Sequence, residues 1–186
     1  MRCDMNYYIV PGYGANANAD WFEWLDQYIV AHRQGSVQRL ALPEDDDLDL
    51  SAWTTYLTKT IDATQANCLI GHSLGVLRIL SYLMATNGQP VSVLLVGGFN
   101  QSLPAFPELD RLLPQTLDEE QLRKRIARGV MVTAQDDPVV PWQLSFDLAS
   151  TLGIDCFVRP TGGHFLGRRA PVIGEIVAGM QKWPLA

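Results

Sequence analysis

The sequence contains no run of about 18 apolar residues, the length that a helix needs to cross the hydrocarbon core of a bilayer. Its first five residues, Met-Arg-Cys-Asp-Met, also lack the apolar stretch of a secretory signal peptide. We therefore expect a cytoplasmic protein that has no membrane partner.

Cysteine is scarce, and the spacings typical of metal sites are missing. Cys3, Cys68 and Cys156 are too few and too scattered for a disulfide framework, and we expect buried thiols. No CxxC or HExxH spacing occurs, so a structural or hydrolytic metal site has little support. The acidic run at residues 44–47 is better explained as a charged surface loop than as a cation site.

Positive charge is also in short supply. The chain has 14 Lys and Arg against 20 Asp and Glu, which gives a formal net charge of -6. Such a charge repels phosphate backbones. The basic residues Arg123, Lys124, Arg125 and Arg128 are predicted to form the solvated face of one helix. Nucleic acid is therefore not expected as a partner.

The 186 residues, 47% of them hydrophobic, are enough for one well-buried core and predict a single domain, 1–186. Apolar runs alternate with segments of helical periodicity. Predicted strands comprise residues 6–10, 37–43, 67–70, 91–97, 130–134 and 154–159. Predicted helices comprise residues 21–32, 50–64, 74–86, 117–128, 142–152 and 172–180, with Asp20 and Ser51 as caps of the first two and Asn87-Gly88 ending the third. This alternation predicts an α/β fold: a doubly wound, mainly parallel sheet of about six strands with helices on both faces.

One stretch organises the rest of the chain. Residues 67–80 run from an apolar strand through Gly-His-Ser-Leu-Gly into a helical pattern. A serine at such a turn is held in a strained conformation, and Gly71 and Gly75 would let the helix pass close beside the strand. Ser73 is therefore a candidate nucleophile with its hydroxyl exposed above the sheet. The structural alternative is a glycine-flanked turn with an N-capping serine.

Ser73, Asp137 and His164 each follow a different predicted strand, and they occur in the chain order of the α/β-hydrolase triad. The carboxyl ends of parallel strands open on the same rim. A serine hydroxyl is a weak nucleophile until an imidazole takes its proton, and the imidazole needs a carboxylate to orient it. We therefore predict that these three residues form a catalytic triad.

Several assignments around the triad have competitors. Asp136 competes with Asp137 for the acid role, and we prefer Asp137 because it directly precedes Pro138. His72 lies beside the nucleophile, but strand alternation should point it away from Ser73, which favours a packing role. The expected oxyanion donors are the backbone amides of Leu74 and Tyr13.

The segment after the strand at 91–97 is too short for a helical lid domain. It is expected to be a loop with at most one short helix. Phe99 and Phe106 could line one wall of a shallow apolar acyl pocket, and Trp142 and Phe165 others, although at least half of such aromatic residues should belong to the core.

Four segments carry a resemblance to the α/β-hydrolase superfamily: residues 10–14 (Val-Pro-Gly-Tyr-Gly), 71–73 (Gly-His-Ser), 136–142 (Asp-Asp-Pro-Val-Val-Pro-Trp) and 163–165 (Gly-His-Phe). With its compact size, the chain resembles the small serine hydrolases related to retinoblastoma-binding protein nine. The resemblance implies a compact hydrolase fold with no large lid, an acyl-enzyme mechanism and no cofactor. It leaves open the small-molecule acyl substrate, and both a non-catalytic binding module and an acyltransferase remain alternatives.

Overall fold

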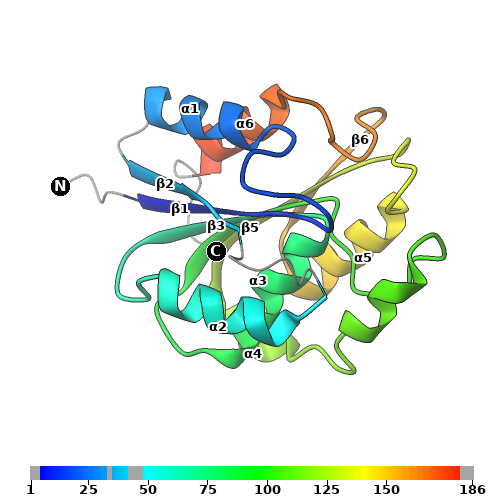
Figure 1. Ribbon diagram of the computed structural model, residues 1–186, viewed down its shortest axis with the longest axis horizontal. Coiled ribbons are helices and arrows are strands. Elements are labelled where there is room, and N and C mark those ends of the chain that lie inside the picture. Colours follow the sequence, from blue (N-terminus) through cyan, green and yellow to red (C-terminus); the bar gives the residue numbers. More distant parts are fainter. Residues whose placement is uncertain (1–4, 33–34, 42–47, 181–186) are drawn as a thin grey trace.

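A computed structural model describes residues 5–32, 35–41 and 48–180, and it confirms the predicted α/β fold (Figure 1). The six strands form one sheet of order β2-β1-β3-β4-β5-β6, and each neighbouring pair is parallel. The strands are β1 (Met5–Val10), β2 (Gly35–Arg39), β3 (Asn67–His72), β4 (Val91–Val96), β5 (Ile126–Ala134) and β6 (Asp155–Arg159). The helices are α1 (Phe22–His32), α2 (Leu50–Thr60), α3 (Leu74–Ala85), α4 (Glu119–Arg125), α5 (Trp142–Leu152) and α6 (Pro171–Met180), with a 3-10 helix η1 (Pro107–Leu112).

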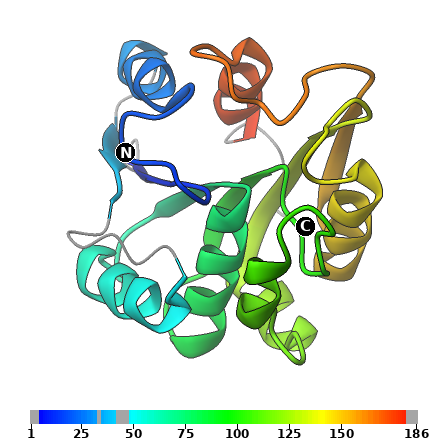
Figure 2. The ribbon, with the colours of Figure 1, turned by 45° about the vertical axis from the view of Figure 1, so that its right-hand side comes forward.

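The helices cover both faces of the sheet. Helices α1 and α6 lie side by side on one face, as both views show, and α2 to α5 cover the other (Figures 1 and 2). Side chains of β1 alternate between the two layers: Tyr7 and Ile9 join the core under α1 and α6, while Tyr8 and Val10 join the opposite core. All six residues of β3 and of β4 are buried, as expected for strands covered on both faces.

The sheet order reverses beside the Ser73 turn. The chain leaves β1 toward the edge strand β2 and then returns to β3 on the other side of β1. In doubly wound sheets such a reversal opens a crevice at the carboxyl ends of the two strands. Here those ends lead into Pro11 and Ser73, so both loops lie where a ligand is expected to bind.

Two helix ends differ from the sequence predictions. Asp49, not Ser51, caps α2, because its carboxylate accepts hydrogen bonds from the amides of Ser51 and Ala52. That helix ends at Thr60 rather than at residue 64. Helix α3 ends in an extended Thr86 with φ -126°, not in left-handed residues at 87–88.

The boundary between α4 and β5 also lies earlier than predicted. Ile126 already pairs with Val91, so Arg128 belongs to a strand rather than to the predicted helix. Arg125 is buried and donates a hydrogen bond to the Thr86 carbonyl. The prediction that these basic residues form one solvated helix face was wrong for Arg125 and Arg128. A hydrogen bond holds Arg125 in the interior, and strand pairing places Arg128 in β5.

Some of the remaining expectations concern residues that the structure describes, and others do not. Cys68 is buried in β3 and Cys156 is half-buried in β6, both as free thiols. The expectations for Cys3, for residues 42–43 of the second strand and for the acidic loop at 44–47 fall outside the described residues. Among the described helices, none is long and apolar enough to span a membrane.

The segment between β4 and α4, described throughout, contains the 3-10 helix η1 and no larger helical insertion. Its leucines Leu103, Leu109 and Leu112 pack with Leu74 and Leu77 of α3 in a third apolar cluster. The predicted absence of a large lid is therefore confirmed for this segment. Its packing places the chain between β4 and α4 over the first turn of the helix that follows Ser73.

Candidate active site

Ser73 occupies the sharp turn between β3 and α3. Its φ of 54° and ψ of -121° lie outside the regions that L-residues prefer, so the turn is strained as the motif predicts. The Ser73 amide donates to the Val96 carbonyl at 2.8 Å, which fixes the turn to the end of β4. A residue held this way keeps its side chain at the rim even though only 8% of its surface is exposed.

The two glycines of the motif are required by close packing. A Cβ atom on Gly71 would lie 2.8 Å from Ile79 Cδ1, and one on Gly75 would overlap the Val10 carbonyl oxygen. Helix α3 therefore passes against both β3 and the end of β1. The predicted reason for Gly71 and Gly75 is confirmed by these contacts.

His164 and Asp137 meet at the carboxyl ends of β6 and β5. His164 Nδ1 lies 2.8 Å from Asp137 Oδ2, and the two side chains are 6% and 0% exposed. The other oxygen, Asp137 Oδ1, accepts hydrogen bonds from the amides of Val139 and Val140 at 2.8 and 2.9 Å. With its carboxylate so held, Asp137 can accept a hydrogen bond from the Nδ1–H of His164, which leaves Nε2 free to act as a base.

Gly97, the first residue after β4, fits against this pair. It has a φ of 57°, and a Cβ atom there would lie 3.2 Å from His164 Cε1 and 3.6 Å from Asp137 Oδ2. Because Val96 accepts the Ser73 amide, the end of β4 joins the serine turn to the histidine. Ser73, Asp137 and His164 thus follow β3, β5 and β6, whose carboxyl ends lie on one rim of the sheet with the end of β4 between the serine turn and the other two.

Asp136 has a different partner. Its exposed carboxylate accepts the Gly163 amide at 2.8 Å, across 27 residues of sequence. Asp136 therefore holds the histidine loop by its backbone, while Asp137 contacts the imidazole itself. The geometry separates the two carboxylates that sequence left in competition.

His72 holds the same loop from the other side. Its Nε2 donates to the His164 carbonyl at 2.8 Å, and its ring makes edge contacts with both Trp21 and Phe22. Burial and then the neighbouring His164 lower the His72 pKa to about 4, so this imidazole is neutral at pH 7. The packing role expected for His72 thus includes a polar anchor that sequence reasoning did not predict.

Asp20 was expected to cap α1, but it lies two residues before the helix with a φ of 47°. Its Oδ2 is 3.7 Å from His72 Nδ1. Burial raises the pKa of the Asp20 carboxyl, while His164 and Arg168 oppose that shift. Asp20 therefore belongs to the polar surroundings of the histidines, a role that local sequence could not indicate.

The expected oxyanion donors lie at the switch point of the sheet. Leu74 is the first residue of α3, where the leading N–H groups of a helix have no partner within the helix. Tyr13 follows Gly12, and a Cβ atom on Gly12 would lie 3.1 Å from Ser73 Cβ. The loop after β1 therefore runs directly beside the serine, as a second donor requires.

The aromatic residues predicted to line the acyl pocket separate into two groups. Phe99 is fully buried in the third apolar cluster, and Phe165 is 7% exposed and packs in the core under α1 and α6. Phe106 and Trp142 are only partly buried. Phe106 meets the exposed ring of Tyr13 edge-on, with 6.4 Å between centroids. Of the four predicted residues, Phe106 and Trp142 are therefore the two that do not belong to the core, and Phe106 contacts the loop after β1 through Tyr13.

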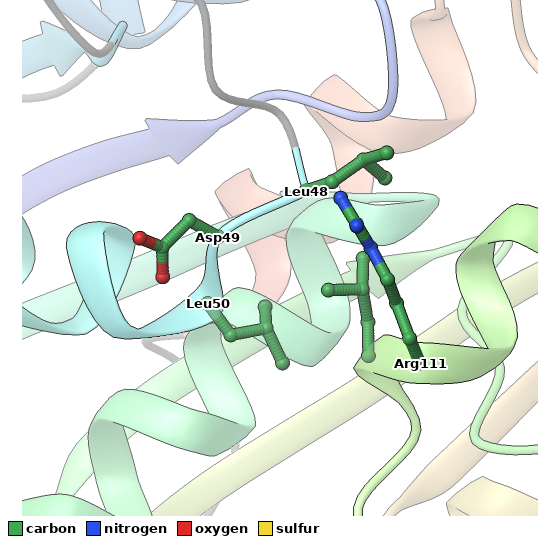
Figure 3. Close-up of a pocket in the computed structure, with 5 residues that line it drawn as sticks. Leu48, Asp49, Leu50 and Arg111 are labelled. Atoms are coloured by element: carbon green, nitrogen blue, oxygen red, sulfur yellow. The ribbon is translucent and has the colours of Figure 1, made fainter.

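A separate hollow of about 450 Å³ lies between the start of α2 and η1, lined by Leu48, Asp49, Leu50, Arg111 and Leu112 (Figure 3). Arg111 extends beside Leu48, whereas Asp49 points away toward the helix that it caps. None of the predicted site residues lines it. In the described part of the chain, no group of three or more His, Cys, Asp or Glu side chains could hold a metal ion.

With this geometry established, the chain can be compared with known proteins. The profile of the family described as serine hydrolase matches residues 7–184. The chain belongs to the serine hydrolase family. YdeN of Bacillus subtilis is 30% identical over 164 residues, which cover 86% of this chain and 85% of YdeN. The rat serine hydrolase RBBP9 is 23% identical over 175 residues, which cover 92% of this chain and 93% of RBBP9.

Solved structures show the same fold. The crystal structure of the ydeN gene product from B. subtilis has a TM-score of 0.86 at 25% identity, covering 97% of this chain and all of that one. The CarC serine hydrolase of carbazole degradation has a TM-score of 0.70 at 14% identity, covering 96% of this chain and 91% of that one. These findings confirm the resemblance to small serine hydrolases, and family membership supports a hydrolytic function.

Proposed function

We propose that this serine hydrolase cleaves a small acyl ester, thioester or amide through an acyl-enzyme on Ser73. The observation that carries the proposal is the buried His164–Asp137 pair, 2.8 Å apart, on the same rim of the sheet as the strained Ser73 turn. A structural serine turn would need neither the strain nor a buried imidazole–carboxylate pair nearby.

In the proposed mechanism, Asp137 accepts the Nδ1–H of His164, which leaves the Nε2 lone pair to take the Ser73 hydroxyl proton as Oγ attacks the acyl carbon. The amides of Leu74 and Tyr13 donate to the oxygen that becomes negatively charged. Collapse of the tetrahedral intermediate breaks the bond to the leaving group, which takes the proton from Nε2. Water then attacks the acyl carbon of the acyl-enzyme while His164 Nε2 takes its proton. Collapse of this second intermediate returns the proton to Ser73 Oγ and releases the carboxylic acid.

The first experiment is labelling with a fluorophosphonate probe, followed by peptide mapping. We expect one adduct on Ser73, and turnover of short p-nitrophenyl esters that is lost in Ser73→Ala. A folded protein that neither labels nor turns over such esters would favour a non-catalytic binding module. Transfer of the acyl group to an added alcohol or amine faster than to water would instead indicate an acyltransferase.

A further inference from the structure

Arg78 is an anomaly in the helix that follows the nucleophile. It is 0% exposed and is one of nine buried residues of α3, of which the other eight are uncharged. Removing a guanidinium from water is costly, and an apolar residue of similar volume often serves stability as well or better. Its presence therefore calls for an explanation other than core stability.

The contacts of Arg78 lead to the loop after β1. Its Nη1 donates to the Pro11 carbonyl at 2.7 Å and to the Gly12 carbonyl at 3.3 Å. The guanidinium carbon also lies 4.2 Å from the centre of the Trp53 ring, a cation–π contact. A buried charge thus ties the helix that begins after Ser73 to the turn that carries Tyr13.

Peptide planarity gives this contact a consequence for the neighbouring N–H groups. In a trans peptide the carbonyl and the following N–H point in opposite directions. Arg78 and the Ala15 amide both donate to the Gly12 carbonyl, so Arg78 helps to fix the plane of the Gly12–Tyr13 peptide and with it the Tyr13 N–H, on the side away from the guanidinium. Gly12 lies against Ser73, so this plane borders the reacting atoms.

We infer that Arg78 is a positioning residue for the oxyanion hole: its two hydrogen bonds to Pro11 and Gly12 hold the Tyr13 amide where it stabilises the transition state. This inference rests on the proposed function. The positive charge acts in the same direction, since the guanidinium contacts the Gly12 carbonyl and Gly12 lies against Ser73. A cation held there favours the negative charge that develops on the oxyanion.

The test replaces Arg78 with methionine, which keeps an unbranched apolar stem but neither the charge nor the donors. We expect kcat on a short p-nitrophenyl ester to fall about 30- to 100-fold, less than loss of a whole oxyanion donor, with KM changed less than about threefold. A trifluoromethyl ketone that forms a tetrahedral adduct on Ser73 should bind weaker by a similar factor. If Arg78 only stabilised the fold, replacing it would not lower both kcat and the affinity for the ketone while leaving KM nearly unchanged.

Arg125→Met is the matched control. Arg125 is also buried and also donates a hydrogen bond to a backbone carbonyl, that of Thr86, but at the opposite end of α3. We expect Arg125→Met to lower the free energy of unfolding while kcat stays within about twofold. If both variants lose kcat equally, the effect of Arg78 is general destabilisation and the inference is wrong.

Arg78→Lys carries the test if Arg78→Met does not fold, because it keeps the buried charge. A single ammonium on a shorter stem should not hold both carbonyls in the same geometry, and we expect a 5- to 20-fold loss of kcat. A folded variant of either kind with wild-type kcat and analogue affinity overturns the inference. Wild-type protein that fails to label at Ser73 would overturn the proposed function instead, so the two failures are distinguishable.

Discussion

Asp137→Asn should separate the catalytic carboxylate from its neighbour. In the native protein Asp137 Oδ1 accepts two backbone amides, so an asparagine must keep its oxygen there and turn its NH2 group toward His164. Two donors would then face each other unless Nδ1 gives up its proton. The imidazole would carry its proton on Nε2, where it cannot accept one from Ser73.

The size of the effect follows from the contact that is lost. A hydrogen bond to a charged group contributes about 1.5–3 kcal/mol, and leaving a buried donor unpaired costs about 1–3 kcal/mol more. Together these give roughly 2.5–6 kcal/mol, and the expected fall in kcat of three to four orders of magnitude, roughly 4–5 kcal/mol at about 1.4 kcal/mol per tenfold change, lies within that range. The backbone contacts of Oδ1 survive, so folding should change little.

Asp136→Asn is the matched control, since the asparagine oxygen can still accept the Gly163 amide. We expect its kcat to stay within about threefold of wild type. The assay is steady-state hydrolysis of a short p-nitrophenyl ester, with thermal unfolding of each variant measured in parallel. Equal losses in the two variants, or a larger loss in Asp136→Asn, would refute the assignment of Asp137 as the acid.

Three further outcomes are expected. His72, with a pKa lowered to about 4, binds fewer protons folded than unfolded, so stability should fall by roughly 3 kcal/mol as pH drops from about 6.5 to 4. Urea unfolding of His72→Gln should show a flatter dependence over that range, and unchanged slopes would argue against the buried imidazole. Gly97→Ala, whose Cβ would press on the His164 ring, should lower kcat at least tenfold, whereas Gly153→Ala, with a similar φ of 69° but no close contact, should leave it unchanged; a matching loss in both would point to backbone strain alone. Esters with acyl chains of about two to six carbons should outperform longer ones, because each buried methylene adds about 0.8 kcal/mol only until the chain reaches solvent; kcat/KM that still rises at twelve carbons would reveal a deep channel.

The parts of this fold that sequence predicted are those with a local cause. The apolar run at 91–97 and the helical spacing at 142–152 correspond to β4 and α5, because burial on both faces or on one stripe leaves a mark on consecutive residues. The Ser73 turn also has a largely local cause, since its two glycines are required by close contacts with atoms of the same strand–turn–helix unit or of the end of β1. Periodicity and turn chemistry suffice for such elements.

The parts that sequence missed depend on partners far along the chain. Asp20 reads as a helix cap, yet its carboxyl group lies near His72, 52 positions later. Arg125 belongs to a charged run in the sequence, but its hydrogen bond to the Thr86 carbonyl holds it in the interior. Arg78 did carry a signal, a single charge inside an apolar helix pattern, although nothing nearby in the sequence indicates that its partners are Pro11 and Gly12.

Backbone strain is concentrated around the two histidines of the site. In the described part of the chain, the non-glycine residues with positive φ are Asp20, Ser73 and Phe165, and all three adjoin the two histidines. Each such residue costs about 1–3 kcal/mol and persists only where surrounding contacts impose it. The contacts are those already named: Val96 holds the Ser73 amide, and His72 holds the carbonyl of the residue before Phe165. Strain gathered at one rim and held by polar anchors is what a preorganised reaction site requires, whereas a binding module that merely kept the fold could relax it without loss.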